Sequence, residues 1–214
     1  MTRRFVAITA LLIAFACPHA AAQDEPPRIG PIVVDLRGSV PRFPRIQPLA
    51  DSRGISVAEL PGMGLGGQLG MHLYFLKWRA ITVGIGGEVI ASRARQTPPS
   101  GAAGLQTVTE TFRSLGTQLS LNFGNGNGWS YLSGGIGRSN WSIVPDLQGP
   151  VAGDDEVLKT INYGGGARWF AKRHLAFTFD VRFYALNPGT GSLGRPGSPR
   201  TTFMVIAAGI SLKP

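Results

Sequence analysis

Apolar and polar residues alternate with a period of two along most of this chain, and this pattern constrains the fold more than any other feature. The clearest example is the segment 174–185. One face of it carries Leu175, Phe177, Phe179, Val181, Phe183 and Ala185, and the other carries Ala176, Thr178, Asp180, Arg182 and Tyr184. Because successive side chains of a strand point to opposite faces, this segment is predicted to be a strand with one apolar face.

Eight segments are predicted to be strands, and all but 201–212, which is apolar on both faces, show this alternation. The eight segments are 32–40, 63–75, 80–93, 106–123, 129–141, 157–169, 174–185 and 201–212. An even number of antiparallel strands is typical of a closed bacterial outer-membrane barrel.

The lengths of the predicted connections alternate along the chain. The long ones are 41–62, 94–105, 142–156 and 186–200, and the short ones are 76–79, 124–128 and 171–173. Outer-membrane barrels have short periplasmic turns and longer external loops, whereas a soluble sandwich has no reason to keep this alternation. The long loops are therefore expected to face outward and the short turns to face the periplasm.

The first residues have the character of an export signal. Arg3 and Arg4 precede an apolar run, 5–17, which is shorter than the roughly 20 residues of a transmembrane helix, and small residues follow at 20–22. We expect a signal peptide over 1–22, a short N-terminal extension over 23–30 and a barrel domain over 31–214. Lipidation of Cys17 is the alternative, which would anchor the chain through acyl chains.

The fold class predicted from these patterns is all-β, an eight-stranded antiparallel up-and-down transmembrane β-barrel after a cleaved signal peptide. Removing Arg3 and Arg4 lowers the formal charge from +9 to +7. The remaining basic residues are scattered rather than gathered in a stripe, so we expect outer-membrane lipids as partners and no nucleic acid.

Tryptophan residues stand near the ends of the predicted strands. Trp78, Trp129 and Trp169 lie beside short turns, and Trp141 lies at the opposite end of its strand. Aromatic rings concentrate at the two levels where hydrocarbon meets headgroup, so these four are predicted to form an aromatic girdle.

Glycine-rich strands and one tight turn carry a family resemblance. They are 129–137 (Trp-Ser-Tyr-Leu-Ser-Gly-Gly-Ile-Gly), 162–170 (Asn-Tyr-Gly-Gly-Gly-Ala-Arg-Trp-Phe) and 175–183 (Leu-Ala-Phe-Thr-Phe-Asp-Val-Arg-Phe). In these segments the chain resembles the small OmpA/OmpX-type outer-membrane β-barrel family. The resemblance implies a membrane-anchored barrel. Because nothing follows the last predicted strand, we expect no peptidoglycan-binding domain of the kind that larger relatives carry. Members of the family usually end the last strand on an aromatic residue, whereas this chain ends Lys213-Pro214.

Motifs that could carry chemistry are few. The glycines of 62–67 satisfy G-x-G-x-x-G, but a strand rather than a helix follows them, so they are interpreted as strand glycines. His72 and His174 are both expected near the short turns, away from an external catalytic rim. Asp146 and the acidic run 154–156 lack the ligand spacing of a calcium loop. We therefore expect no catalytic residue, no cofactor and no bound metal.

Six charged residues fall on the polar faces of the predicted strands. They are Asp35, Arg37, Glu88, Arg168, Asp180 and Arg182. An eight-stranded barrel is just wide enough for side chains to fill it, and charges inside must be paired. Counted from the short turns, Glu88 and Arg182 lie at similar depth, with Asp180 and Arg37 one layer lower. The group is predicted to be a salt-bridged plug, with a gated polar path as the alternative.

The function expected from these observations is that of a non-enzymatic outer-membrane protein. The barrel would be the anchor, and the long loops would serve envelope structure or bind a surface partner, with the protein acting as a monomer. Two alternatives remain open at this stage. One is a secreted soluble barrel that binds an apolar ligand, as lipocalins do, with its apolar faces inward. The other is a narrow polar pore.

Overall fold

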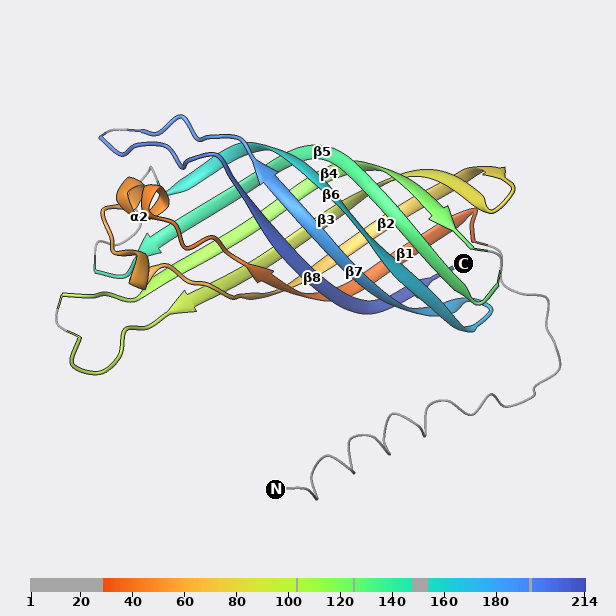
Figure 1. Ribbon diagram of the computed structural model, residues 1–214, viewed down its shortest axis with the longest axis horizontal. Helices are drawn as coiled ribbons and strands as arrows, with labels where there is room; N and C mark the ends of the chain where they lie inside the picture. Colours follow the sequence, from red (N-terminus) through yellow and green to blue (C-terminus); the bar gives the residue numbers. More distant parts are fainter. Residues whose placement is uncertain (1–28, 103, 125, 148–153, 193) are drawn as a thin grey trace, which may run out of the picture.

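A computed structural model describes residues 29–214 except 103, 125, 148–153 and 193. Eight antiparallel strands follow one another around a closed barrel, each paired with its neighbours in sequence order. β1 pairs with β8, with Val34 opposite Leu212 and Arg42 opposite Met204, and this pairing closes the barrel (Figure 1). The predicted fold class, an eight-stranded up-and-down barrel, is confirmed.

Five of the eight strands (β1, β2, β3, β5 and β6) are longer than the segments predicted from the apolar alternation. The bounds of all eight are β1 Ile32–Arg42, β2 Leu65–Trp78, β3 Ile81–Gln96, β4 Val108–Phe123, β5 Gly128–Pro145, β6 Asp155–Lys172, β7 Leu175–Leu186 and β8 Thr201–Leu212. β8 has the bounds predicted for it, whereas β3 and β5 run three or four residues further toward the long loops than predicted. At these ends the strands remain paired beyond the apolar band, where the outward residues become polar. A prediction from apolar periodicity therefore ends each strand too early.

The connections alternate in length as predicted. Two-residue turns join β2 to β3 and β6 to β7, and the turn between β4 and β5 is also short. We call this the short-turn end, and the other the long-loop end, where the connections 43–64, 97–107, 146–154 and 187–200 lie. The chain enters β1 and leaves β8 at the short-turn end (Figure 1). The predicted signal peptide, with Cys17, lies outside the described residues.

The connection from β1 to β2 contains two short helical segments that the alternation did not predict. These are α2 (Gln47–Arg53) and the 3₁₀ turn η1 (Val57–Glu59). Proline in the first turn of α2 and a left-handed Gly54 after it are ordinary helix boundaries. Ser56 and Glu59 form a capping box around η1. Both segments lie at the long-loop end (Figure 1).

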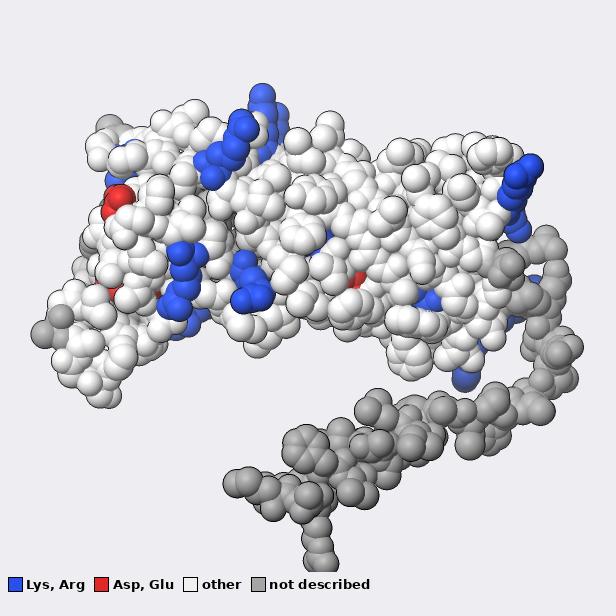
Figure 2. Space-filling view, viewed as in Figure 1, with Lys and Arg blue, Asp and Glu red and all other residues white. Residues whose placement is uncertain are grey.

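The apolar faces of the strands point outward. Leu132 is 59% exposed and Ile136 is 68% exposed, and apolar side chains on the other strands are exposed in the same way. In Figure 2 the middle of the visible face is almost free of charged side chains. The secreted-barrel alternative requires these faces to point inward, so the orientation of the described strands contradicts it. Within the described part of the chain, no helix is long and apolar enough to cross a membrane.

Candidate functional site: the lumen of the barrel

The six charged residues predicted on the polar faces all point into the lumen. Each is at most 4% exposed. They come from four strands, namely β1 (Asp35 and Arg37), β3 (Glu88), β6 (Arg168) and β7 (Asp180 and Arg182). Three arginines face three carboxylates, so the group carries no net formal charge. We call it the lumen charge network.

Asp35 is the centre of the network at its short-turn side. Its carboxylate accepts two hydrogen bonds from the Arg168 guanidinium, at 3.1 and 2.7 Å, and lies 2.8 Å from Nη2 of Arg37. The hydroxyl of Ser211 donates to the same carboxylate at 2.5 Å. A buried charge is tolerated only when its lone pairs are satisfied in this way.

Glu88 links the other members of the network. Its Oε2 lies 3.4 Å from Nη1 of Arg37, and its Oε1 lies 3.4 Å from Nε of Arg182. Tyr184 donates its phenolic hydrogen to Oε1 of Glu88 at 2.7 Å. Glu88 and Arg182 are thus brought together across the lumen, as the depth count anticipated.

Arg182 is also fixed by neutral groups and by Asp180. Its Nη2 donates to Ser133 at 2.7 Å and lies 3.1 Å from Oδ2 of Asp180, while Nη1 donates to the side-chain carbonyl of Asn162 at 3.2 Å. Tyr131 donates to Asp180 at 2.7 Å. The result is a connected polar layer in which each of the six charged groups touches an opposite charge.

Inward-facing glycines make room for the large side chains of this layer. A Cβ atom at Gly86 would lie 2.5 Å from the ring of His72, and one at Gly166 would lie 2.6 Å from the hydroxyl of Tyr131. Real Cβ atoms do not approach so closely, so these two positions require glycine. Some of the 30 glycines of the chain therefore serve the packing of the barrel interior.

A cluster of buried apolar side chains lies on each side of the charges, and we call these two clusters the apolar layers. The layer at the short-turn end consists of Ile29, Val33, Tyr74, Trp129, Phe170 and Ala176. At the long-loop end a larger cluster joins residues of the strands, among them Phe112, Trp141 and Phe203, to Leu49, Ala50, Ile55 and Leu60 of the 43–64 connection. That connection therefore folds over the mouth of the barrel as a lid.

A buried ion pair holds the lid in place. Nη2 of Arg53, at the end of α2, lies 2.5 Å from Oε2 of Glu156 and donates to Ser198 at 2.7 Å. Nη1 of Arg53 donates to the carbonyl of Pro196 at 3.2 Å. One arginine thus joins the first long loop to the fourth and to the start of β6.

A closed barrel of eight antiparallel strands, apolar outside and polar inside, has a recognised counterpart. The chain has the fold of the small outer-membrane β-barrels. Antiparallel pairing satisfies the backbone of every strand around the closed ring, which is the condition for strands to span a hydrocarbon layer.

Two of the four predicted girdle tryptophans occupy other positions in this barrel. Trp78 and Trp169 are 65% and 54% exposed, but Trp129 and Trp141 are buried in the apolar layers, so the girdle prediction is wrong for those two. Leu132 and Ile136 point outward on the same strand, and their positions differ from those of both tryptophans by odd numbers, so the tryptophans lie on the opposite, inward face. The alternation along the strand therefore indicated that these two tryptophans point inward, whereas their positions near the strand ends had suggested a girdle. Trp141 donates its indole hydrogen to Glu110 at 2.7 Å.

The histidines lie as follows. His72 is buried in the lumen, with Nδ1 3.7 Å from Asp35 and Nε2 3.2 Å from Oε1 of Gln118. His174 lies exposed at a short turn, against the carbonyl of Lys213. Neither lies at the long-loop rim. The described residues hold no group of three or more acidic, histidine or cysteine side chains placed to bind a metal ion.

Comparisons with solved structures give similar barrels. Neisserial surface protein A (NspA) aligns over 86% of this chain and 97% of its own, with a TM-score of 0.47 and 11% sequence identity. Ail, the attachment invasion locus protein of Yersinia pestis, solved with the heparin analogue sucrose octasulfate, aligns over 84% and 96%, with a TM-score of 0.42 and 13% identity. No family model matches the chain, and no curated protein resembles it significantly.

Proposed function

We propose that this protein is a non-enzymatic barrel of a Gram-negative outer membrane, with a sealed lumen. The barrel serves as the anchor, and the long loops serve envelope structure or contact a surface partner. The observation that carries the proposal is the neutral lumen charge network enclosed between two apolar layers. A barrel built to conduct would need a continuous wetted path past both layers.

The outward orientation of the long loops follows from the membrane location. Short turns face the periplasm in outer-membrane barrels, so the lid and the other long connections face the outside. Arg53 joins the lid to the fourth long loop and to the start of β6, which presents these two loops to a partner in one fixed arrangement. A fixed loop surface loses less conformational entropy on binding than a flexible one.

Catalysis has little support in this lumen. His72 is enclosed by Asp35, Gln118 and the ring of Tyr74, below the apolar layer that the lid completes. A substrate would have to displace one of the two apolar layers to reach it. We therefore propose a structural role for His72, within the polar filling of the barrel.

A narrow polar pore is the second candidate, and one observation favours it. The Gln68 side-chain amide and the Ser39 hydroxyl are buried without a hydrogen-bond partner among the described residues. This side of the lumen therefore offers polar groups to water. The pore would still have to open both apolar layers.

Conductance in planar bilayers tests the sealed barrel. We expect the purified protein to conduct no steady current under conditions in which a general porin gives open-channel steps. Membrane fractionation and heat-modifiable gel mobility would show in parallel that the same preparation is a folded membrane barrel. Steady conductance from folded protein would favour the pore, and recovery of the protein in a soluble fraction would refute the outer-membrane location.

A further inference from the structure

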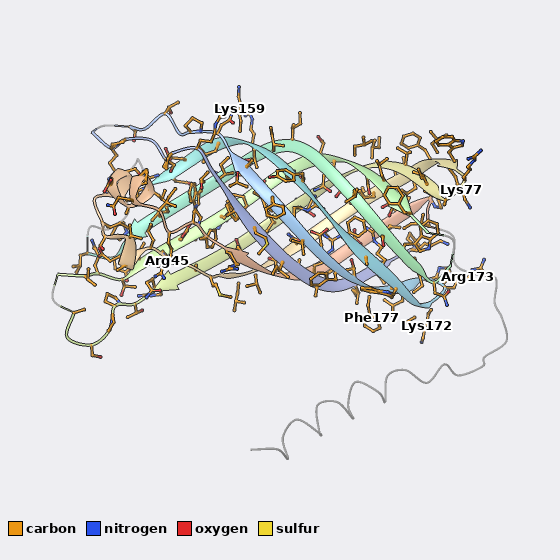
Figure 3. All side chains as sticks on the ribbon, in the orientation of Figure 1. Arg45, Lys77, Lys159, Lys172, Arg173 and Phe177 are labelled. Atoms are coloured by element: carbon orange, nitrogen blue, oxygen red, sulfur yellow. The ribbon has the colours of Figure 1, made fainter. Side chains whose placement is uncertain are left out.

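Four basic side chains on neighbouring strands point away from the barrel near the long-loop end. They are Arg93 on β3, Arg113 on β4, Arg138 on β5 and Lys159 on β6, and we call them the basic belt. All four are exposed, and none of them forms an ion pair with a described residue. Figure 2 shows basic side chains in the half of the barrel nearer α2, and Figure 3 shows Lys159 projecting outward there.

The strand register brings these cations together. Arg138 is directly opposite Lys159. Arg113 is opposite Asn140, two residues from Arg138, so Arg113 and Arg138 are diagonal neighbours. Like charges directly opposite on paired strands destabilise a sheet, so a cation pair without a carboxylate is explained best by an anion bound from outside.

The depth of the belt matches a membrane interface. Lys159 and Lys172 bracket the outward face of β6, and between them that face carries Ile161, Tyr163 and Trp169. Their 13-residue separation corresponds to about 43 Å along the strand, and to about 30–33 Å along the barrel axis at a tilt of about 40–45°. That slightly exceeds the roughly 25 Å apolar band of outer-membrane barrels, so the belt lies at headgroup level.

An apolar groove begins on the same two strands, on the membrane side of the cation pair. It has a volume of about 610 Å³ and is lined by Leu132, Gly134, Tyr163, Gly165 and Phe183, among others. Gly134 and Tyr163 each lie four residues from the belt, on the strands of Arg138 and Lys159 respectively. The missing side chain at Gly134 hollows the groove, and the rings of Tyr163 and Phe183, stacked with centroids 5.5 Å apart, line one side of it.

We propose that Arg138, Lys159 and this groove bind one lipid with a net anionic phosphate headgroup, in the leaflet at the long-loop end. The phosphate lies between the two cations, and an acyl chain lies in the groove along Gly134 and Gly165. Neighbouring Arg113 adds a third positive charge at headgroup level. The proposal takes the membrane location from the proposed function and is independent of whether the lumen conducts.

Backbone amide NMR of the protein purified from membranes into detergent micelles tests the site. We expect short-chain phosphatidic acid to shift the amide signals of Arg138, Gly134 and Gly165, and the matching phosphatidylcholine to leave them in place. Inorganic phosphate should shift the signal of Arg138 without moving those of Gly134 and Gly165, which separates a lipid from a free anion. Phosphatidylcholine carries a phosphate whose charge is balanced by its choline cation, so equal shifts with the two lipids would refute a site for an anionic lipid.

Two variants and one control locate the binding. Changing both Arg138→Gln and Lys159→Gln should weaken phosphatidic acid binding about thirty-fold, because each cation at a membrane surface contributes roughly a factor of five. Gly134→Leu, whose Cβ would be 3.5 Å from its nearest neighbour, should fill the groove and abolish the lipid response while keeping the phosphate response. The control pair Lys172→Gln and Arg173→Gln removes the same charge at the other end and should bind as the wild type does.

Heat-modifiable mobility of each variant establishes that it folds before it is titrated. Folded protein in the membrane fraction that shows no phosphatidic acid response would refute the lipid site and leave the proposed function intact. Protein that fails to fractionate with membranes would refute the proposed function itself. Unchanged binding by the Arg138→Gln, Lys159→Gln variant would also refute the site.

Discussion

Nε of Arg182 lies 3.4 Å from Oε1 of Glu88, on the opposite side of the lumen, and both side chains are buried. The two residues belong to strands that are not neighbours in the barrel, so only the narrowness of the lumen brings them into contact. Among the described residues, Glu88 is the one carboxylate that lies within ion-pair distance of both Arg37 and Arg182. The balance of the lumen charge network therefore depends on it.

Removing Glu88 should destabilise the barrel. Glu88→Ala leaves three buried arginines facing two carboxylates, and we expect it to lower the free energy of unfolding by about 3–5 kcal/mol. The loss of unfolding free energy should lie near the lower end of this range because Arg182 keeps its contacts with Asp180 and Ser133. Urea titration in lipid vesicles, followed by tryptophan fluorescence, measures the change.

Energetic coupling between Glu88 and Arg182 distinguishes a pair from two independent residues. The double variant Glu88→Gln, Arg182→Met should lose less stability than the two single variants summed, by about 0.5–3 kcal/mol. The exposed pair Arg95 and Asp146, 2.8 Å apart, is the control and should couple by at most about 1 kcal/mol. Additive losses at Glu88 and Arg182 would contradict their pairing.

An arginine introduced on the outer face should impair folding and assembly more strongly the deeper it lies in the apolar band. Phe179 points outward two residues from Val181, which is paired with Gly165 midway along the apolar band of β6. Phe179→Arg should cost about 2–4 kcal/mol or block assembly, whereas Phe177→Arg, nearer Lys172 and the short-turn interface (Figure 3), should cost less. Folded yield in outer-membrane fractions gives the measurement.

Thr178→Arg completes this comparison. Thr178 points into the lumen and is paired with Arg168, so a second guanidinium there meets both crowding and like charge. It should prevent folding in detergent as well as in membranes, whereas Phe179→Arg should still fold in detergent micelles. Normal membrane assembly of Phe179→Arg would refute the lipid-facing assignment.

Chemical labelling on intact cells tests the orientation of the barrel. Cysteines introduced at Ser100 and Thr190, both exposed in long loops, should react with a membrane-impermeant maleimide. One at Asn127, exposed in a short turn, should react only after the outer membrane is permeabilised. The reverse pattern would place the short turns outside.

Most of the strands were predictable from sequence because an apolar outer face and a polar filling inside the barrel make apolar and polar residues alternate along them; β8, which is apolar on both faces, is the exception. The same alternation indicates which residues enter the lumen, and it identifies Asp35, Glu88 and Arg182 correctly as inward-facing. It also marks Trp129 and Trp141 as inward-facing, against the girdle prediction. This alternation depends only on neighbouring positions along one strand, so it can be identified in the sequence without knowing how the strands pair or close the barrel.

The partners inside the lumen could not be predicted in this way. Asp35 and Arg168 are 133 positions apart on strands that are not adjacent, and they meet only because the ring closes with a particular stagger between β1 and β8. A count along single strands ignores that stagger. The lid was missed for another reason, although its signals, Pro48, Gly54 and the Ser56 to Glu59 capping box, were in the sequence. Strand alternation does not detect helical turns inside a loop.

The lid should open when its clamp is removed. Arg53 joins α2 to Glu156, Ser198 and the carbonyl of Pro196, and it is almost fully buried. Arg53→Ala leaves the Glu156 carboxylate without its cation, so we expect the 43–64 connection to lose its fixed position while the eight strands keep theirs. Hydrogen exchange should then speed up at the amides of Ala50, Gly54 and Ile55, which bond within the lid, and stay slow at paired strand amides. Gln47→Ala removes only an exposed hydrogen bond to Asp51 and should leave exchange unchanged at Ile55. Unchanged exchange in Arg53→Ala would mean that the apolar contacts of Leu49 and Leu60 hold the lid without the ion pair.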